Sequence, residues 1–421
     1  MEEEVRKLVT IKEIDKITPI EGADRIECAH IGGWMVVVGK GEFYEGQQVF
    51  YFEPDSLLPV NRSYFINLKP RGVKLIDGNE YHRLRTVKLR GQISQGLALP
   101  FSVINEIIPD PDRQLDVLTE IEENGGNYSK LFGVIKYEDP ILAKLGGKMK
   151  HFPEFIQKTD EERIQNLPKL VNQIEKERSN NEWYATEKID GTSCTIWARI
   201  TEDGILESGV CSRNYGLEEE DDNTYWKIAK TPMIPYEFAS TDDSGLCTPL
   251  EYVKMKCLEE ARSMGGTNTP IYALQGEVFG EGIQKNPLGM KGQHFRVFNL
   301  VHNGVRVLRS EIVKNYQELL KVWVPIHDEL VLPSTMEDIV SQPDGVFSTV
   351  PGCQPNRQIE GIVWRNYNSN EIKVEKRKSL DEIDWSKIPK EKWDLVRKSV
   401  DEPVVASFKA ISNEYLAKLK D

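Results

Sequence analysis

Lys188 lies between two acidic residues in the stretch EKIDGTSCTIW, residues 187–197, which continues as an alternating strand. A nucleophilic lysine must first lose its proton, and an ordinary pKa of about 10.4 keeps lysine charged at neutral pH. Nearby cations or a metal ion lower that pKa. Asp190, on the same side of an extended chain, could hold such a metal, and Gly191 lets a phosphate or nucleotide approach the backbone. The stretch predicts either a lysine that attacks a nucleoside triphosphate or an exposed ion pair at the end of a strand.

The sequence around Lys188 predicts a domain of strands separated by glycine turns, with a few helices. Asn303 and Gly304 are at the centre of a predicted type I′ hairpin. Ser310 is the predicted cap of a helix that runs to Trp323 and buries one apolar face. Further strands are predicted at 271–280, 358–365 and 404–412. This pattern indicates an α+β domain built on antiparallel sheets.

The first third of the chain predicts a small barrel of short strands rich in Val, Ile, Tyr and Phe. Its last segment is basic in an otherwise acidic protein, through Lys69, Arg71, Lys74, Arg83, Arg85, Lys88 and Arg90. A basic strand and loop face with aromatic neighbours suits an OB barrel that grips a phosphate backbone. A solvated edge that only prevents strand pairing is the alternative.

Length and charge limit the possibilities further. The chain has 421 residues, which predicts about two domains, and the polar stretch after residue 103 separates them. We place an OB-like domain with its linker at residues 1–145 and a second domain at 146–421. The net charge of −13 argues against polyanion binding by the whole surface. Scattered cysteines, no membrane-length apolar run and no signal peptide predict an intracellular protein, cytoplasmic or nuclear, with reduced thiols and no membrane partner.

Several motifs occur in order along the second domain, and together they resemble the covalent nucleotidyltransferases, the superfamily of ATP-dependent RNA and DNA ligases and mRNA capping enzymes. The segments are EKIDGTS, CSRN, QGEVFGEGIQKN, FRVFNL, EGIVWR and SFKAISNEYL. The GIQKN extension resembles the RNA ligase 2 family. The stretches from RKLVTIKEIDKI to RTVKLRGQISQGLALP resemble the N-terminal OB domain of a nick-sealing branch of RNA ligases. The resemblance implies an OB-type β-barrel followed by an antiparallel-sheet nucleotidyltransferase domain, an ATP-grasp-like ligase fold.

The resemblance also implies roles for single residues. Lys188 would form lysyl-AMP from ATP, while Glu187 would read the adenine or its neighbourhood and Phe298 would stack on the base. Mg²⁺ or Mn²⁺ would be held, through water, by carboxylates: Asp190, Glu277 and Glu360. Arg213 would contact phosphate, ribose or the 5′ end of a nick, Glu277 also the ribose, and Lys409 the α-phosphate. Independently of the resemblance, the basic cluster predicts that Arg83, Arg85, Lys88 and Arg90 contact nucleic acid.

The sequence departs from the family pattern at three places. Asn299 stands where relatives often have Asp, Ile411 stands where a second lysine often follows Lys409, and the segment between Glu360 and Lys409 is long. Lys373 is the alternative to Lys409 in the last motif. The function expected is a monomeric ATP-dependent RNA ligase that seals nicks in duplex RNA or an RNA/DNA hybrid. The alternatives are a capping-type guanylyltransferase and a nonenzymatic RNA-binding protein with a dead nucleotidyltransferase domain.

Overall fold

The computed structural model describes residues 6–76, 78–137, 149–159, 161–177, 182–220, 222–235, 245–264, 269–368 and 406–418. The chain divides into two compact units, residues 1–139 with 416–421, and residues 140–415. The predicted domain boundary at residues 145 and 146 lies outside the described residues. Across the described ranges, no helix is long and apolar enough to span a bilayer.

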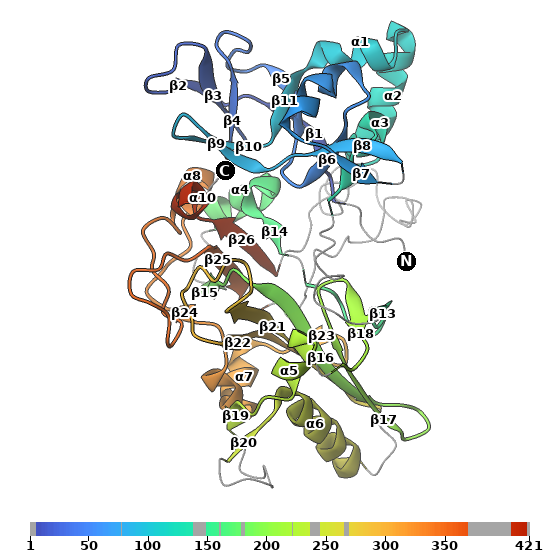
Figure 1. Cartoon of the computed structure of the whole chain (residues 1–421), viewed down its shortest axis with the longest axis vertical. Coiled ribbons are helices and arrows are strands. Elements are labelled where there is room, and N and C mark those ends of the chain that lie inside the picture. Colours follow the sequence, from blue (N-terminus) through green and yellow to red (C-terminus); the bar gives the residue numbers. More distant parts are fainter. Residues whose placement is uncertain are drawn as a thin grey trace, which may run out of the picture. The chain divides into compact units, whose positions relative to one another are not determined.

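The first unit contains short strands and short helices, coloured blue to cyan in Figure 1. Its strands are β1 (Val9–Glu13), β2 (Lys16–Pro19), β3 (Ile26–Ile31), β4 (Trp34–Gly39), β5 (Gln48–Phe52), β6 (Ser56–Pro59), β7 (Lys74–Ile76), β8 (Asn79–Arg83), β9 (Thr86–Leu89), β10 (Gln92–Gln95), β11 (Leu97–Pro100) and β12 (Ile135–Lys136). Its α-helices are α1 (Ile104–Ile107), α2 (Pro111–Glu123) and α3 (Ser129–Phe132), and a 3₁₀ helix, η1, covers Ser63–Arg71.

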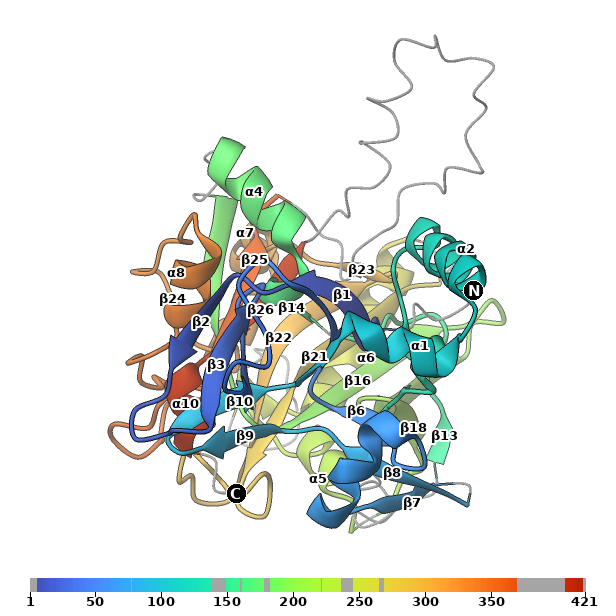
Figure 2. The same cartoon turned by 90° about the horizontal axis from the view of Figure 1, so that it is seen from above.

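Side-chain alternation along the strands builds the core of this unit. Trp34, Val36 and Val38 on β4 point inward and pack with Tyr51, while the residues between them are partly exposed. A second cluster gathers aromatic rings, with Phe50 and Phe52 edge-on to Phe132 at 4.9 and 5.0 Å between ring centroids. Figure 2 shows β2 and β3 side by side, as their antiparallel pairing requires. The predicted strand-rich N-terminal domain is therefore confirmed.

The second unit is built on two large sheets. Its strands are β13 (Met149–His151), β14 (Glu162–Arg163), β15 (Trp183–Lys188), β16 (Thr192–Ile200), β17 (Leu206–Cys211), β18 (Tyr215–Leu217), β19 (Ile234–Pro235), β20 (Leu246–Cys247), β21 (Ile271–Gly280), β22 (Gln293–His302), β23 (Val305–Arg306), β24 (Ile326–His327), β25 (Gly361–Asn366) and β26 (Ser407–Ile411). Its helices are α4 (Pro168–Glu177), α5 (Thr224–Ala229), α6 (Pro249–Ser263), α7 (Arg309–Asn315), α8 (Met336–Ser341) and α10 (Asn413–Lys418), with 3₁₀ helices at Ile164–Asn166 (η4) and Gln317–Lys321 (η6).

Each sheet has its own apolar core. The seven-stranded sheet, in the order β13-β18-β17-β16-β21-β22-β23, packs one face against α6, which begins with a capping box of Thr248 and Glu251 (Figure 1). The five-stranded sheet, in the order β14-β26-β25-β15-β24, buries Ile362, Trp364 and Phe408 against α4 and α8. Because side chains alternate along a strand, the other face of each sheet presents polar groups, although the seven-stranded sheet also buries Ala273 and Val301 there.

Two local predictions had different outcomes. The hairpin is confirmed, because Asn303 and Gly304 both have positive φ, of 51° and 80°, between β22 and β23. The single helix from Ser310 to Trp323 is wrong. The helix ends at Asn315, and a 3₁₀ turn follows it. Its N-cap is Leu308 rather than Ser310, and the side chain of Leu320 is 41% exposed. Within the 3₁₀ turn, side chains no longer keep the 3.6-residue period on which the predicted stripe depended.

A buried arginine joins the polar faces of the two sheets. Arg365 on β25 is 2% exposed, and its Nη1 donates to Oδ1 of Asn299 on β22 at 2.8 Å. Its Nε donates to Thr186 on β15 and its Nη2 to Glu161, both at 3.3 Å. Nδ2 of Asn299 donates in turn to Gln275 on β21 at 3.1 Å. The missing charge at Asn299 is thus replaced by an amide that satisfies an arginine and a glutamine together.

We expect Arg365→Met to lower the free energy of unfolding of the second unit by about 3 kcal/mol, because it leaves buried acceptors without their donor. Arg262→Met, on the exposed end of α6, is the control and should change it by less than about 0.5 kcal/mol. Urea denaturation followed by tryptophan fluorescence measures both. Equal stability of the two variants would contradict a structural role for the Arg365 network.

Candidate active site

Strand pairing places Lys188 at the end of β15 on the polar face of the five-stranded sheet. Lys188 is opposite Gly361 on β25, and Glu360 is the residue just before that strand. The Nζ of Lys188 lies 2.6 Å from Oε2 of Glu360, and the two side chains are 25% and 19% exposed. The ion pair considered from sequence therefore exists, but its partner comes from 172 residues further along the chain.

Lys409 is on the same sheet face as Lys188. It pairs with Val363 on β25, and Val363 pairs with Thr186 on β15, two residues before Lys188. Directly paired residues of antiparallel strands share a face, so Thr186, Lys188 and Lys409 point the same way. Lys373, the alternative, lies outside the described residues. The choice of Lys409 for the last motif remains a prediction, supported by this register.

Two further carboxylates are electrostatically coupled to Lys188. Glu277, on β21, pairs in register with Ser193 on β16, just after the lysine motif. Burial raises its pKa to about 8, with Lys188 and Arg213 opposing and Glu360 and Asp190 adding to the rise. Burial also raises the pKa of Asp190 to about 6, and the charge of Glu360 contributes. The site thus gathers three acidic side chains around one ammonium group, and their mutual repulsion favours the protonated form of Glu277 and Asp190.

The residues around Lys188 act on its pKa in opposite directions. Burial by itself lowers the pKa of Lys188, but the charges of Glu360, Glu277 and Asp190 outweigh it and raise that pKa above its ordinary value. The carboxylates therefore keep the lysine protonated. Only a positive charge brought in near them would make proton loss easier.

Gly191 and Phe298 owe their positions to neighbouring strands. A Cβ on Gly191 would lie 2.3 Å from the carbonyl oxygen of Val278, so the close approach of β21 requires glycine there. The sequence had attributed this glycine to a phosphate. Phe298 is the extra residue of a β-bulge, because Gln275 pairs with Asn299 and Gly276 with Val297. The bulge directs Phe298 toward the apolar cluster that contains Ile189 and Val350.

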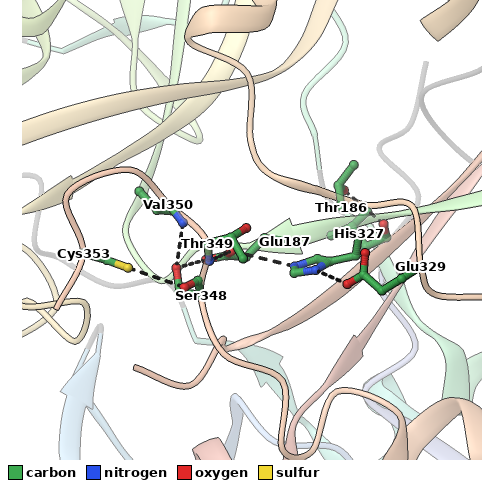
Figure 3. A network of polar contacts seen from close by, with 9 residues as sticks. Thr186, Glu187, His327, Glu329, Ser348, Thr349, Val350 and Cys353 are labelled. Atoms are coloured by element: carbon green, nitrogen blue, oxygen red, sulfur yellow. Dashed lines mark hydrogen bonds and ion pairs between the residues drawn. The ribbon is translucent and has the colours of Figure 1, made fainter. Parts of the chain in front are cut away.

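Glu187 points to the face opposite Lys188, since adjacent strand residues alternate. It is 2% exposed and accepts hydrogen bonds from Ser348 Oγ at 2.5 Å and Thr349 N at 3.1 Å. Figure 3 shows His327 on its other side, with Nε2 3.9 Å from Glu187 and Nδ1 3.0 Å from Glu329. Glu187 therefore anchors the loop at 348–353 to β15, and its contact with adenine remains a prediction.

The residues predicted to contact nucleic acid differ in their exposure and in their ion pairs. Arg83 pairs with Asp55 at 2.6 Å, and its guanidinium lies 3.6 Å from the centre of the Tyr137 ring. Arg85, Lys88 and Arg90 are exposed on and around β9. Arg83 thus has a structural role in the first unit, and the other three residues form its accessible basic group.

The sequence analysis did not predict two features of the ligase motifs. Tyr415 on α10 donates a hydrogen bond to Asp190, although the chain separates them by 225 residues.

Gln284, Lys285 and Asn286, in the GIQKN extension, all have positive φ, between 44° and 61°. Asn286 closes this turn through hydrogen bonds with the backbone of Met290. A run of such strained residues often marks a functional loop, and the Lys-Asn pair was the only signal for it in the sequence.

The acidic side chains near Lys188 are oxygen donors that suit a divalent metal ion. Within the ranges that the structure describes, no group of three or more His, Cys, Asp and Glu side chains is placed to ligate one metal. Glu360 nevertheless raises the pKa of both Asp190 and Glu277, so these carboxylates share one field. Carboxylate oxygens suit hard divalent cations such as Mg²⁺ or Mn²⁺.

We expect Glu277→Gln to raise the melting temperature of the metal-free protein at pH 8 by at least about 2 °C. An acid whose pKa rises from 4.5 to about 8 on folding binds more protons in the folded state. Stability is therefore lost as the pH rises through that interval, and a neutral glutamine avoids the loss. At pH 4 the advantage should vanish, and calorimetry at both pH values measures it. A gain of equal size at pH 4 would contradict the electrostatic cause.

The comparisons with known proteins place the chain. A family model described as RNA ligase matches residues 181–380, and one described as an OB-fold domain matches residues 8–101. A comparison with curated protein sequences found no match.

Solved structures of an RNA ligase from Naegleria gruberi match nearly the whole chain. A mutant form with ATP and Mn is 30% identical, with 98% of this chain and 99% of that chain covered and a TM-score of 0.65. The ligase with PPi is 32% identical over 98% and 99% of the two chains, with a TM-score of 0.64. A mutant with AMP and Mn is 31% identical over 99% and 100%, also with a TM-score of 0.64. The chain therefore belongs to the RNA ligase family, with an N-terminal OB-fold domain followed by a sheet-rich ligase domain.

Proposed function

We propose that this RNA ligase uses ATP to seal nicks with a 3′-hydroxyl and a 5′-phosphate in duplex RNA or an RNA/DNA hybrid. The observation that carries the proposal is the position of Lys188, 2.6 Å from Glu360 on a sheet face that also presents Lys409. A lysine held among carboxylates, with a second cation on the same face, suits attack on a phosphate. The Naegleria gruberi ligase with ATP and Mn supports the choice of nucleotide.

Lys188 attacks the α-phosphorus of ATP, and a phosphorus–nitrogen bond forms as the bond to pyrophosphate breaks. Lys409 stabilises the negative charge that develops on the α-phosphate, and Arg213 contacts the phosphate or the 5′ end. The AMP then passes from Lys188 to the 5′-phosphate of the nick. Attack by the 3′-hydroxyl releases AMP and forms the phosphodiester. These three steps convert the poor leaving group of the 5′-phosphate into a good one, AMP.

Asp190, Glu277 and Glu360 would hold Mg²⁺ or Mn²⁺ through its bound waters. When bound there, the ion supplies positive charge that opposes the carboxylates and favours the neutral amine of Lys188. Glu360 pairs with the ammonium of Lys188 before ATP arrives and so keeps the side chain aimed across the site. Phe298, directed by the β-bulge, is the residue for stacking on the adenine ring.

We expect the wild-type protein to form a covalent protein–AMP adduct with α-labelled ATP and a divalent metal, and none with GTP. Lys188→Ala should abolish the adduct because the nucleophile is gone. Lys409→Ala should lower its rate by about a hundredfold, since one cation near a developing phosphate charge is worth that much. Labelled adduct on a denaturing gel is the measurement.

Lys256→Ala is the matched control for this experiment. Lys256 also pairs with carboxylates, Glu259 at 3.4 Å and Glu318 at 3.6 Å, but on α6 and away from β15. It should leave adduct formation unchanged. Full labelling of Lys188→Ala would remove Lys188 from the mechanism, and full activity of Lys409→Ala would transfer its role to another lysine such as Lys373. Labelling by GTP would favour the guanylyltransferase alternative.

We expect the triple variant Arg85→Ala, Lys88→Ala, Arg90→Ala to bind nicked duplex more weakly and to seal it poorly, yet to form the AMP adduct normally. Each lost phosphate contact releases about 0.9 fewer counterions on duplex DNA, so the salt dependence should fall by about two to three. Arg83 is left in place because it pairs with Asp55. Nick affinity across a salt series is the measurement.

A triple variant of exposed basic residues elsewhere in the first unit, Lys40→Ala, Arg113→Ala, Lys130→Ala, carries the same change in net charge. It should keep the salt slope of the wild type. If both triple variants showed the same dependence of nick affinity on salt, the basic residues at β9 would be only a solvated strand edge. Loss of the AMP adduct in the first triple variant would show instead that this unit supports the ligase domain.

A further inference from the structure

The short segment after Lys409 returns to the active site at two points. The backbone N–H of Ser412 donates to the carbonyl oxygen of Glu360 at 2.9 Å. The hydroxyl of Tyr415 donates to Oδ2 of Asp190. Tyr415 is 9% exposed, so its ring is packed and its hydroxyl reaches the carboxylate from the protein side. One segment of β26 and α10 thus contacts both residues that flank Lys188 in space.

The position of Tyr415 is fixed by its own hydrogen bonds. Oγ of Ser412 accepts from the N–H of Tyr415 at 3.0 Å and donates to Asp344 at 2.7 Å. Nε2 of Gln358 donates to the same Oγ at 2.7 Å. These groups hold the first turn of α10 to the loop at 344 and 345, so the tyrosine hydroxyl cannot simply follow Asp190 if that side chain rotates.

Three carboxylates compete for one ammonium group in this site. Lys188 bonds to Glu360, while Asp190 bonds to Tyr415, although both acids are close enough to Lys188 to act on its charge. A neutral donor on Asp190 satisfies that carboxylate without adding a second ion pair to the lysine. Partners of this kind orient the groups that surround a metal, and their loss typically costs about 10- to 100-fold in metal affinity.

We propose that Tyr415 is a positioning residue, which holds Asp190 in the orientation needed for the waters of the divalent metal and keeps it from pairing with Lys188. The catalytic role of Tyr415 rests on the proposed function, whereas its hydrogen bond to Asp190 does not. Tyr415 thereby makes the geometry of the lysine motif depend on the segment that carries Lys409. Sequence spacing gives no sign of this link.

Tyr415→Phe removes the hydroxyl and keeps the ring. We expect Mn²⁺ to bind about tenfold more weakly to this variant in the presence of the α,β-methylene analogue of ATP, as measured by electron paramagnetic resonance of free Mn²⁺. In adduct formation from ATP, kcat should fall about tenfold while KM for ATP changes less than about threefold. In an Asp190→Asn background, Tyr415→Phe should have no further effect on Mn²⁺ affinity, because the two residues act as one unit.

Tyr272→Phe is the matched control. Its hydroxyl also donates to a carboxylate, Glu260 at 2.7 Å, outside the active site, and it should leave both readouts unchanged. Unchanged Mn²⁺ affinity in Tyr415→Phe, or a loss that persists in the Asp190→Asn background, would overturn the proposal. A wild-type protein that binds Mn²⁺ with this coupling but forms no AMP adduct would overturn the proposed function and leave the role of Tyr415 intact.

Discussion

The ammonium group of Lys188 is the charge around which the ligase domain is organised. Glu360 bonds to it directly, and Glu277 and Asp190 act on it through their fields. These acids raise its pKa, so the same contacts that aim the side chain also prevent its reaction. Positive charge added beside these acids would therefore make proton loss from Lys188 easier. For the proposed transfer of AMP to Lys188, the carboxylates would therefore position the amine but hold it protonated until a cation arrives.

Two sheets with separate cores supply these groups. Lys188 and Lys409 belong to the five-stranded sheet and Glu360 immediately precedes its strand β25, whereas Glu277 and Phe298 belong to the seven-stranded sheet. Each sheet packs helices on one face, and the other face presents these polar side chains. Arg365 connects the two polar faces through Asn299 and Thr186. The separation between the two sheets near Lys188 consequently depends on this buried hydrogen-bond network, which lies outside the group of acids around Lys188.

Lys188 and its neighbour Glu187 point to opposite faces of the five-stranded sheet. Glu187 is buried beside Ser348 and His327, where it holds the loop that packs Val350 against Ile189 (Figure 3). Arg83 in the first unit is a parallel case, because Asp55 and Tyr137 engage its guanidinium. In both places a residue whose type suggests ligand binding is used to fix a neighbouring segment. Beside Arg83, the side chains of Arg85, Lys88 and Arg90 are exposed.

The sequence by itself determined the order of the two domains and the family, because these depend on local residue patterns and on motifs in a fixed order. It also predicted Lys188 as the nucleophile, with the acids of its motif beside it. It also placed the hairpin at Asn303 and Gly304, since a turn is local. Only the tertiary structure decided that Glu360 is the partner of Lys188, that Tyr415 holds Asp190, that Phe298 occupies a bulge, and that Gly191 makes room for β21. Those features arise from strand register and from contacts between residues far apart in the chain. Residue spacing along one segment carries no information about which distant strand will lie beside it.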